Sequence, residues 1–375
     1  MKKYISCFLS FFSLVSANPI SEKINSFGSD FYQESLSNEN ICFSPYSMFS
    51  SLSTAYLGSK EDTKKELAKA LYIDQNFFEA FSLFSKNLHS DQLNSANAIW
   101  LEKQVSLCDD YQASIKDLDI QVFSNNPLSA STINAWVAEK TKNKIQNLLA
   151  PSDIEKSTQV ILTNALHFES VWIKPFRKEL TCPGEFYIND QESTITQMMG
   201  QKSHFPYYEN DLYQLLLLPI QSSSSSYTCF FLLPKTSFNN FESTFNLSTL
   251  LDQIHLASLT LVNVHLPKFT VEQTLQAKGI LQNLGIKKAF SSEANFSGLI
   301  KKENLFIDKV IHKVFFSIEE KGVTASAATA ITMNKFAALV RPEEPIFFTA
   351  NHPFMFGIVD LNSDLVLFLG KLTRP

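Results

Sequence analysis

The segment Glu319–Ala330 constrains the fold most, because it joins strand periodicity to unusually small side chains. A β-rich run, Leu305–Ile318, precedes it, and Gly322 is expected to permit a backbone reversal that other residues resist. Beyond Gly322 the side chains alternate with a period of two, which places one set on each face of a strand. The more apolar set is Val323, Ala325, Ala327, Thr329, Ile331 and Met333.

Small side chains lose little rotamer entropy when they become ordered. The segment could therefore change between an exposed loop and a buried strand at low cost. Taken alone, it is equally compatible with an ordinary edge strand or an Ala-rich linker.

Composition indicates a globular protein with a large core. The 375 residues are 45% hydrophobic and include 33 Phe, which argues against disorder. The net charge of −5 gives no electrostatic reason to expect nucleic acid or an anionic membrane as a partner. Helical patterns early and strand patterns late, without a clear boundary or repeat, predict a single α+β domain.

Residues 1–17 have the pattern of a signal peptide. Lys2 and Lys3 precede an apolar run, and Val15–Ala17 supplies small residues for cleavage. The run is too short for a stable membrane span. We therefore expect an exported mature chain beginning at Asn18, secreted or periplasmic; the alternative is a buried N-terminal helix.

Motifs for catalysis or metal binding are absent. The chain has no GxSxG, HExxH, P-loop, GxGxxG or CxxC motif, and its seven His have no metal-ligand spacing. We expect neither an enzyme nor a cofactor or metal. The cysteines that remain after export are expected to be mostly free, buried thiols: Cys42, Cys108, Cys182 and Cys229. Sequons at Asn246 and Asn295 matter only if the source glycosylates exported proteins.

Periodicity predicts the main elements. Helices are expected over Ile20–Glu34, Phe49–Tyr56 (starting at Ser44-Pro45), Thr63–Leu71, Phe77–Leu88 and Thr132–Leu149, the last stopped by Pro151. Strands are expected over Ala96–Leu101, Val160–Trp172, a pair within Tyr213–Leu233 and a hairpin over Phe354–Leu372. Val160–Trp172 is apolar on both faces, which favours the centre of a large sheet.

Five blocks of the chain resemble the serpin family in sequence and in order. They are Asn40–Leu71, Leu162–Phe176, Leu266–Leu299, Ile311–Ala330 and Phe347–Pro375. With the intervening chain they cover nearly everything after residue 20. The resemblance implies a single serpin domain over 18–375: a large, mainly antiparallel sheet A, two smaller sheets, eight to nine helices and an exposed reactive-centre loop at about 320–346.

The resemblance also implies a function. Inhibitory serpins are irreversible suicide-substrate inhibitors of serine proteases, and of some cysteine proteases. The protease cuts the loop and is trapped as an acyl-enzyme while the loop enters the main sheet. The implied hinge residues are Glu320, Gly322, Val323, Thr324, Ala325, Ser326, Ala327 and Ala328. Val323 and Thr324 depart from the inhibitory consensus, although neither should block insertion; the alternative is a non-inhibitory carrier, chaperone or storage serpin.

Two further groups carry implied roles. Ser44, Ser47, Asn164 and His312 match the family's shutter, a polar network behind the middle of the main sheet. Without the resemblance, a helix cap and ordinary structural polar residues would explain them better. Lys268 and Glu320 match an ion pair at the breach, where the loop first inserts, and Trp172 is expected nearby.

In inhibitory serpins the scissile bond follows the hinge glutamate at a nearly fixed spacing. The resemblance therefore implies, by counting from Glu320, that Phe336 lies before the bond and Ala337 after it. The alternatives are Lys335–Phe336 and Leu339–Val340. Phe336 suits the apolar pocket of a chymotrypsin-like or subtilisin-like protease, whereas Lys335 would suit a trypsin-like one. The target protease is the expected partner of a monomeric inhibitor.

Overall fold

The computed structural model describes residues 18–74, 77–88, 92–102, 107–116, 118, 120–124, 128–222, 225–300, 305–323 and 343–375. The predicted signal peptide at 1–17 lies outside these residues. So does most of the predicted loop, 324–342.

Nine α-helices occur in this part of the chain. They are α1 (Pro19–Glu34), α2 (Pro45–Gly58), α3 (Glu61–Ala70), α4 (Phe77–Leu88), α5 (Asp109–Ile115), α6 (Ala130–Lys140), α7 (Phe238–Thr244), α8 (Leu247–Leu256) and α9 (Lys278–Asn283). The first four confirm the sequence predictions to within a few residues. α2 begins at the predicted Ser-Pro start, where the Ser44 hydroxyl accepts a hydrogen bond from the Ser47 backbone N–H.

A seven-stranded sheet runs along the molecule in the order β3-β2-β4-β12-β13-β5, with β11 also paired to β12. Its strands are β2 (Leu93–Leu101), β3 (Gln121–Phe123), β4 (Val160–Phe168), β5 (Ser170–Val171), β11 (Phe269–Gln276), β12 (Lys309–Glu319) and β13 (Gly322–Val323). The predicted central position of β4 is confirmed, since β2 and β12 flank it. β4 and β12 are parallel, from Ile161 opposite Lys309 to His167 opposite Phe315. We call this contact the seam.

The remaining strands form a nine-stranded sheet. They are β1 (Ile41–Phe43), β6 (Thr181–Tyr187), β7 (Ser193–Glu209), β8 (Tyr213–Pro219), β9 (Tyr227–Pro234), β10 (Ser258–Pro267), β14 (Ile346–Thr349), β15 (Phe354–Asp360) and β16 (Leu365–Leu372). The long strand β7 pairs with β6 and β10 along most of its length and with β8 at its C-terminal end. It thereby joins the two smaller sheets that the resemblance implies. The hairpins β8–β9 and β15–β16 confirm the predicted strand pairs.

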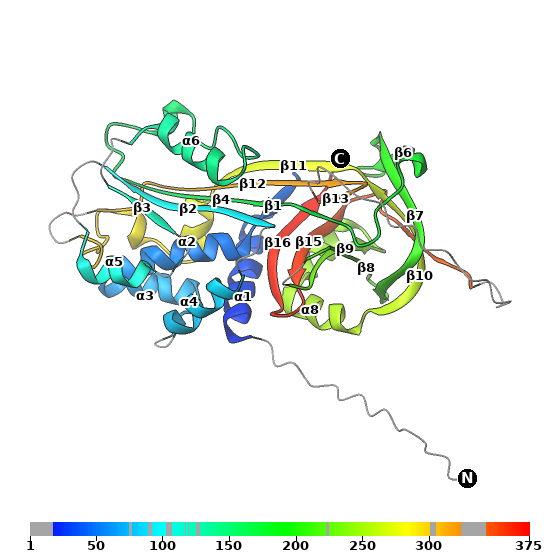
Figure 1. Ribbon diagram of the computed structural model, residues 1–375, viewed down its shortest axis with the longest axis horizontal. Helices are drawn as coiled ribbons and strands as arrows, with labels where there is room; N and C mark the ends of the chain where they lie inside the picture. Colours follow the sequence, from blue (N-terminus) through cyan, green and yellow to red (C-terminus); the bar gives the residue numbers. More distant parts are fainter. Residues whose placement is uncertain are drawn as a thin grey trace, which may run out of the picture.

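Helices cover both faces of the seven-stranded sheet. α1 to α5 lie on one side and α6 on the other, while the β15–β16 and β8–β9 hairpins continue the first layer (Figure 1). Alternation along β4 separates two cores: Leu162 and Leu166 join the main core beneath α2, whereas Ile161 and Ala165 join a smaller core beneath α6.

The predicted helix Thr132–Leu149 is wrong at its C-terminal end. α6 stops at Lys140, and Lys142 and Asn143 then have φ of 52° and 61°, a left-handed conformation that ends an α-helix. Ile145 and Leu148 nevertheless pack in the core beneath α6. The apolar pattern therefore identified residues that face the sheet, although their backbone is not helical. The predicted strand Val160–Trp172 is likewise divided into β4 and β5.

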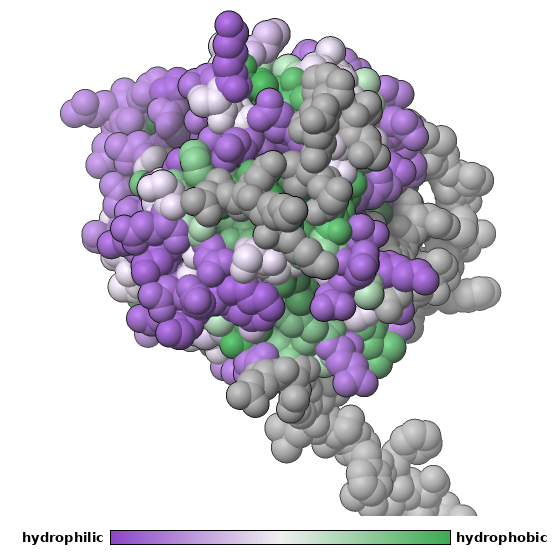
Figure 2. Space-filling view, turned by 90° about the vertical axis from the view of Figure 1, so that its left-hand side faces the viewer, coloured by the Kyte–Doolittle hydropathy of each residue, from purple (hydrophilic) through white to green (hydrophobic). Residues whose placement is uncertain are grey.

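The end of the molecule that carries α5 is mainly hydrophilic, with hydrophobic residues gathered towards its middle (Figure 2). Among the described helices, none is both long and apolar enough to span a membrane. The four described cysteines are free. Cys42 and Cys229 are buried as expected, whereas Cys108 is half-buried and Cys182 is exposed.

Candidate functional site

The predicted hinge begins as a short strand inside the seven-stranded sheet. After β12 the chain turns at Glu320 and Lys321 and returns as β13. Val323 lies opposite Ile318 of β12 on one side and opposite Ser170 of β5 on the other, antiparallel to both. Its side chain is 1% exposed and belongs to the main core. The hinge residues Gly322 and Val323 thus occupy a strand position between β12 and the continuation of β4.

Gly322 is required for a reason that differs from the predicted one. The reversal takes place at Glu320 and Lys321, and among the described glycines only Gly285 has a positive φ. A Cβ at Gly322 would instead lie 2.1 Å from the Ser170 carbonyl oxygen and 2.6 Å from the Val171 Cα. Because both obstacles are backbone atoms, the glycine allows β13 to approach β5 closely.

Glu320 makes an ion pair at the turn. Its Oε2 lies 2.9 Å from the Lys268 Nζ, and its Oε1 accepts a hydrogen bond of 3.0 Å from the Thr181 hydroxyl. The Glu320 side chain is 8% exposed and that of Lys268 34%. Burial raises the pKa of Glu320, but the hydrogen bonds from Lys268, from its own backbone and from Thr181 outweigh this and hold the pKa below its usual value. The carboxylate is therefore ionised at neutral pH.

Trp172 also holds this turn through two hydrogen bonds. Its indole N–H donates to the Glu319 carbonyl at 2.9 Å, and its backbone N–H donates to the Lys321 carbonyl at 2.9 Å. The Phe176 backbone N–H donates to the Glu320 carbonyl at 2.8 Å. The structure thus brings the three predicted breach residues together around one turn.

The four predicted shutter residues also meet, at the middle of the seam. All four are fully buried. The Ser44 backbone N–H donates to His312 Nε2 at 3.0 Å, so the ring proton lies on Nδ1, which donates to Asn164 Oδ1. The Asn164 amide then donates to the Ser47 carbonyl and hydroxyl oxygens, each at 2.6 Å. The N-terminus of α2 is thereby tied to both strands of the seam.

Burial holds His312 neutral. Loss of solvation lowers the pKa of His312 to about 3, and the hydrogen bond with Asn164 only partly opposes this. The tautomer assigned above can therefore persist well into acidic solution.

Asn97 belongs to this network, although the sequence did not identify it. It lies on β2 directly opposite Asn164, and its Oδ1 accepts from the Asn164 amide at 2.6 Å and from the Ser47 hydroxyl at 3.0 Å. A signal existed in the sequence: Asn97 has the same parity as Ile99 and Leu101, which both face the main core. A polar residue on that face needs a partner.

The remaining predicted site residues lie outside the described part of the chain. They are the hinge residues Thr324, Ala325, Ser326, Ala327 and Ala328, and the reactive-bond candidates Lys335, Phe336, Ala337 and Leu339. The described chain resumes at Glu343, whose Oε2 lies 3.1 Å from His204 Nε2 on β7. Glu343 thus lies beside β7.

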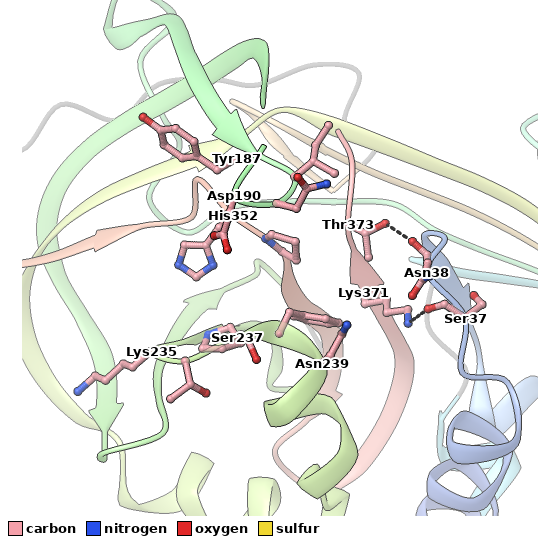
Figure 3. A pocket seen from close by; sticks show the side chains of 16 residues that line it. Ser37, Asn38, Tyr187, Asp190, Lys235, Ser237, Asn239, His352, Lys371 and Thr373 are labelled. Carbon is pink, nitrogen blue, oxygen red and sulfur yellow. Dashed lines mark hydrogen bonds between the residues drawn. The ribbon is translucent and has the colours of Figure 1, made fainter. Parts of the chain in front are cut away.

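A large cavity lies elsewhere. It has a volume of about 990 Å³ and is bordered by the β6–β7 turn, the start of α7 and the end of β16 (Figure 3). The Lys371 ammonium is paired with Glu242 at 2.7 Å and also donates to the Ser37 carbonyl; the Thr373 hydroxyl donates to the Asn38 carbonyl at 3.1 Å. No sequence-predicted site residue lines this cavity. We therefore place the candidate site at the hinge and seam.

Comparison with known proteins agrees with this architecture. Residues 22–375 match the family model described as Serpin (serine protease inhibitor). This chain belongs to the serpin family. The resemblance noted in the sequence is thus confirmed, and so is the expected serpin fold.

Serpins of distant organisms are similar over almost the whole chain. An uncharacterized serpin-like protein of Thermococcus kodakarensis is 33% identical over 95% of this chain and 86% of its own length. Leukocyte elastase inhibitor of Bos taurus is 34% identical over 90% of this chain and 93% of its own. Among solved structures, Serpin48 of Tenebrio molitor has a TM-score of 0.83 and 30% identity, covering 95% of this chain and 98% of that one.

Proposed function

We propose that this serpin is an irreversible protease inhibitor whose cleaved loop enters the seam as a new strand. The observation that carries the proposal is β13, which already lies between β12 and β5 and is antiparallel to both. A loop extending from β13 would enter the sheet along the seam. Serine proteases are the proposed main targets and cysteine proteases a secondary class.

Strand register supports insertion along the seam. Val323 lies opposite Ser170 and Ile318. Continuing both pairings residue by residue would place residue 326 between His167 and Phe315, and residue 329 between Asn164 and His312. His167 faces Phe315, and Asn164 faces His312, in the closed seam. The two seam strands would therefore separate sideways without sliding past each other.

The side-chain pattern fits the same register. Because Val323 faces the main core, every second residue after it would face that core as well. These positions carry Ala325 and Ala327 and then Thr329, whose hydroxyl would arrive beside the Asn164–His312 pair. Small side chains near the hinge would enter with little steric resistance.

Hydrogen bonds alone do not decide whether insertion is favourable. Each new ladder hydrogen bond contributes about 1 kcal/mol net, which the backbone entropy cost of about 1–2 kcal/mol per residue offsets. Burial of apolar surface at about 25 cal/mol per Å² must therefore supply the difference. Relief of strain in the uncut fold would add to it.

We further propose that the cut falls between Phe336 and Ala337, with Lys335–Phe336 and Leu339–Val340 as alternatives. Phe336 would select a chymotrypsin-like or subtilisin-like protease. A monomer exported through the signal peptide 1–17 would meet such proteases outside the cell or in the periplasm.

The test mixes the chain without residues 1–17 with chymotrypsin-, subtilisin-, elastase- and trypsin-like proteases. The expected result is a complex with one of the first two that survives boiling in detergent, and a released peptide that begins at Ala337. A peptide beginning at Phe336 or Val340 would select another bond. Cleavage without any stable complex would overturn the inhibitor proposal and favour a non-inhibitory carrier, chaperone or storage serpin.

A further inference from the structure

His167 is a buried histidine without a hydrogen-bond partner. It lies on β4 and has no exposed surface, yet within the described part of the chain neither ring nitrogen has a partner. Asn94 lies directly opposite on β2, and its Nδ2 is also buried and unpaired. His312, in contrast, uses both ring nitrogens. Buried polar groups are nearly always paired, so this defect requires an explanation.

The unpaired His167 ring lies at the end of the seam. His167 is the last β4 residue paired with β12, opposite Phe315, with the two ring centroids 6.5 Å apart. Three residues further along, Ser170 pairs with β13 instead. His167, whose ring nitrogens lack hydrogen-bond partners, therefore lies where β4 and β12 cease to pair with each other.

Charged groups near His167 come from three directions. Glu169 follows it on the same segment, and Lys142 and Lys144 approach from the turn after α6. On β12, Lys313 lies two residues before Phe315 on the same face; it is paired with Glu272 of β11 at 2.8 Å and donates to the Gln146 carbonyl at 2.9 Å. Lys309, which is paired with Asp153, and Glu319 lie further along that face. β2 contributes the neutral Asn94.

These surroundings disfavour a charged ring. Burial lowers the pKa of His167 to about 4; Glu169 acts in the opposite direction, and Lys144 and Lys142 reinforce the burial. At neutral pH His167 is therefore uncharged. In mild acid, a conformation that exposes the ring to water would bind a proton that the closed seam does not.

We propose that His167 is an acid-sensitive release point of the seam, at which protonation favours separation of β4 from β12 near the hinge. Because the open state binds the extra proton, the stability of the closed seam falls as the pH drops from about 6.5 towards about 4. This inference rests on the proposed function in one respect: the proposed function explains why the seam would need to open, namely to admit the cleaved loop. Opening itself is a property of the uncut fold.

The test measures amide hydrogen exchange in the uncut protein, corrected for the intrinsic pH dependence of exchange. Protection of the seam amides of Leu166 and Phe315 is compared with that of Phe231 in β9. When the pH is lowered from about 7.5 to about 5.5, a histidine that is protonated only in the open state should reduce the protection of the seam amides about tenfold. We expect this contribution from His167 in the wild type. The Phe231 amide should not follow this change.

Two variants assign the effect. His167→Phe keeps a ring beside Phe315 and should raise the protection of the seam amides at neutral pH. It should also abolish the roughly tenfold loss of protection in acid that is due to His167. His167→Gln should remove the same acid dependence while keeping a buried polar group, so its seam should stay weaker than that of His167→Phe. His265→Phe, on β10 of the other sheet, serves as the control and should behave as the wild type.

An unchanged acid dependence in both His167 variants would overturn the proposal and assign the effect to His312 or another group. If His167→Phe does not fold, His167→Gln still decides the acid dependence. The exchange measurement needs no protease. Failure to trap proteases would thus count against the proposed function and leave this inference standing.

Discussion

Asn164 and His312 face each other across the seam, and the His312 Nδ1–H donates to the Asn164 Oδ1. The same two side chains hold Ser44 and Ser47 at the start of α2. One hydrogen-bonded group therefore joins both seam strands to the helix beneath them. Any strand that enters the seam must break the contact between Asn164 and His312.

Removing either partner should therefore weaken the closed sheet. His312→Ala or Asn164→Ala leaves buried groups unpaired, which costs about 1–3 kcal/mol of unfolding free energy. We expect lower thermal midpoints and polymers on gentle heating, detected by native electrophoresis. His265→Ala, on the other sheet, is the control. Unchanged melting without polymer in both variants would contradict a role for this network in keeping the seam closed.

Gly322→Ala should release β13 from the sheet. Its new Cβ would collide with the backbone of Ser170 and Val171, so the strand must shift away from β5. We expect faster proteolytic cleavage near Val323 and a larger fraction of protein that is cut without trapping protease. Gly279→Ala is a matched control, because nothing lies within 4 Å of its Cβ. Equal cleavage rates for the two variants would show that the close approach to β5 is not needed.

The ion pair of Lys268 and Glu320 should affect timing more than stability. The partly exposed Lys268 makes the pair worth about 0–1 kcal/mol. Glu320→Gln keeps an oxygen that can accept the hydrogen bond from Thr181, but it removes the negative charge that pairs with Lys268. We expect little change in the melting temperature. Under the proposed function, inhibitory activity should be lost faster during incubation, because the turn at Glu320 is less firmly held. A large drop in melting temperature with unchanged activity loss would reverse this assignment.

Under the proposed function, Ala327→Arg should make the protein a substrate of its target protease instead of an inhibitor. In the register set by Val323, residue 327 would face the main core, where an unpaired charge is costly to bury. The loop should then be cut without completing insertion. Ala327→Ser, which stays small and uncharged, should keep trapping protease. A stable complex formed by Ala327→Arg would show that the assignment of faces along the loop is wrong.

Local patterns in the sequence were sufficient for most elements, whereas long-range pairing was not. Periodicity located α4 and the central strand β4, but it could not show that Lys142 and Asn143 end α6 in a left-handed turn. Gly322 was recognised as special, yet its reason is the backbone of Ser170, a neighbour distant in sequence. Similarly, the family resemblance implied the four predicted shutter residues. Parity along β2 placed Asn97 on the core face, but its pairing with Asn164 depends on a register that no single strand encodes.

Asn97 therefore provides the sharpest test of the network. Asn97→Ala removes the acceptor shared by Ser47 and Asn164 without touching the seam itself, because β2 lies on the far side of β4. We expect it to lower the unfolding free energy by about 1–3 kcal/mol. In a double-mutant cycle with Asn164→Ala, residues in one hydrogen-bond network should show a coupling of about 0.5–3 kcal/mol. The same cycle between Asn97 and the distant His265 should be additive. Additivity for both pairs would mean that Asn97 and Asn164 act independently. Asn97 of β2, Asn164 of β4 and His312 of β12 would then make separate contacts and would not form one network.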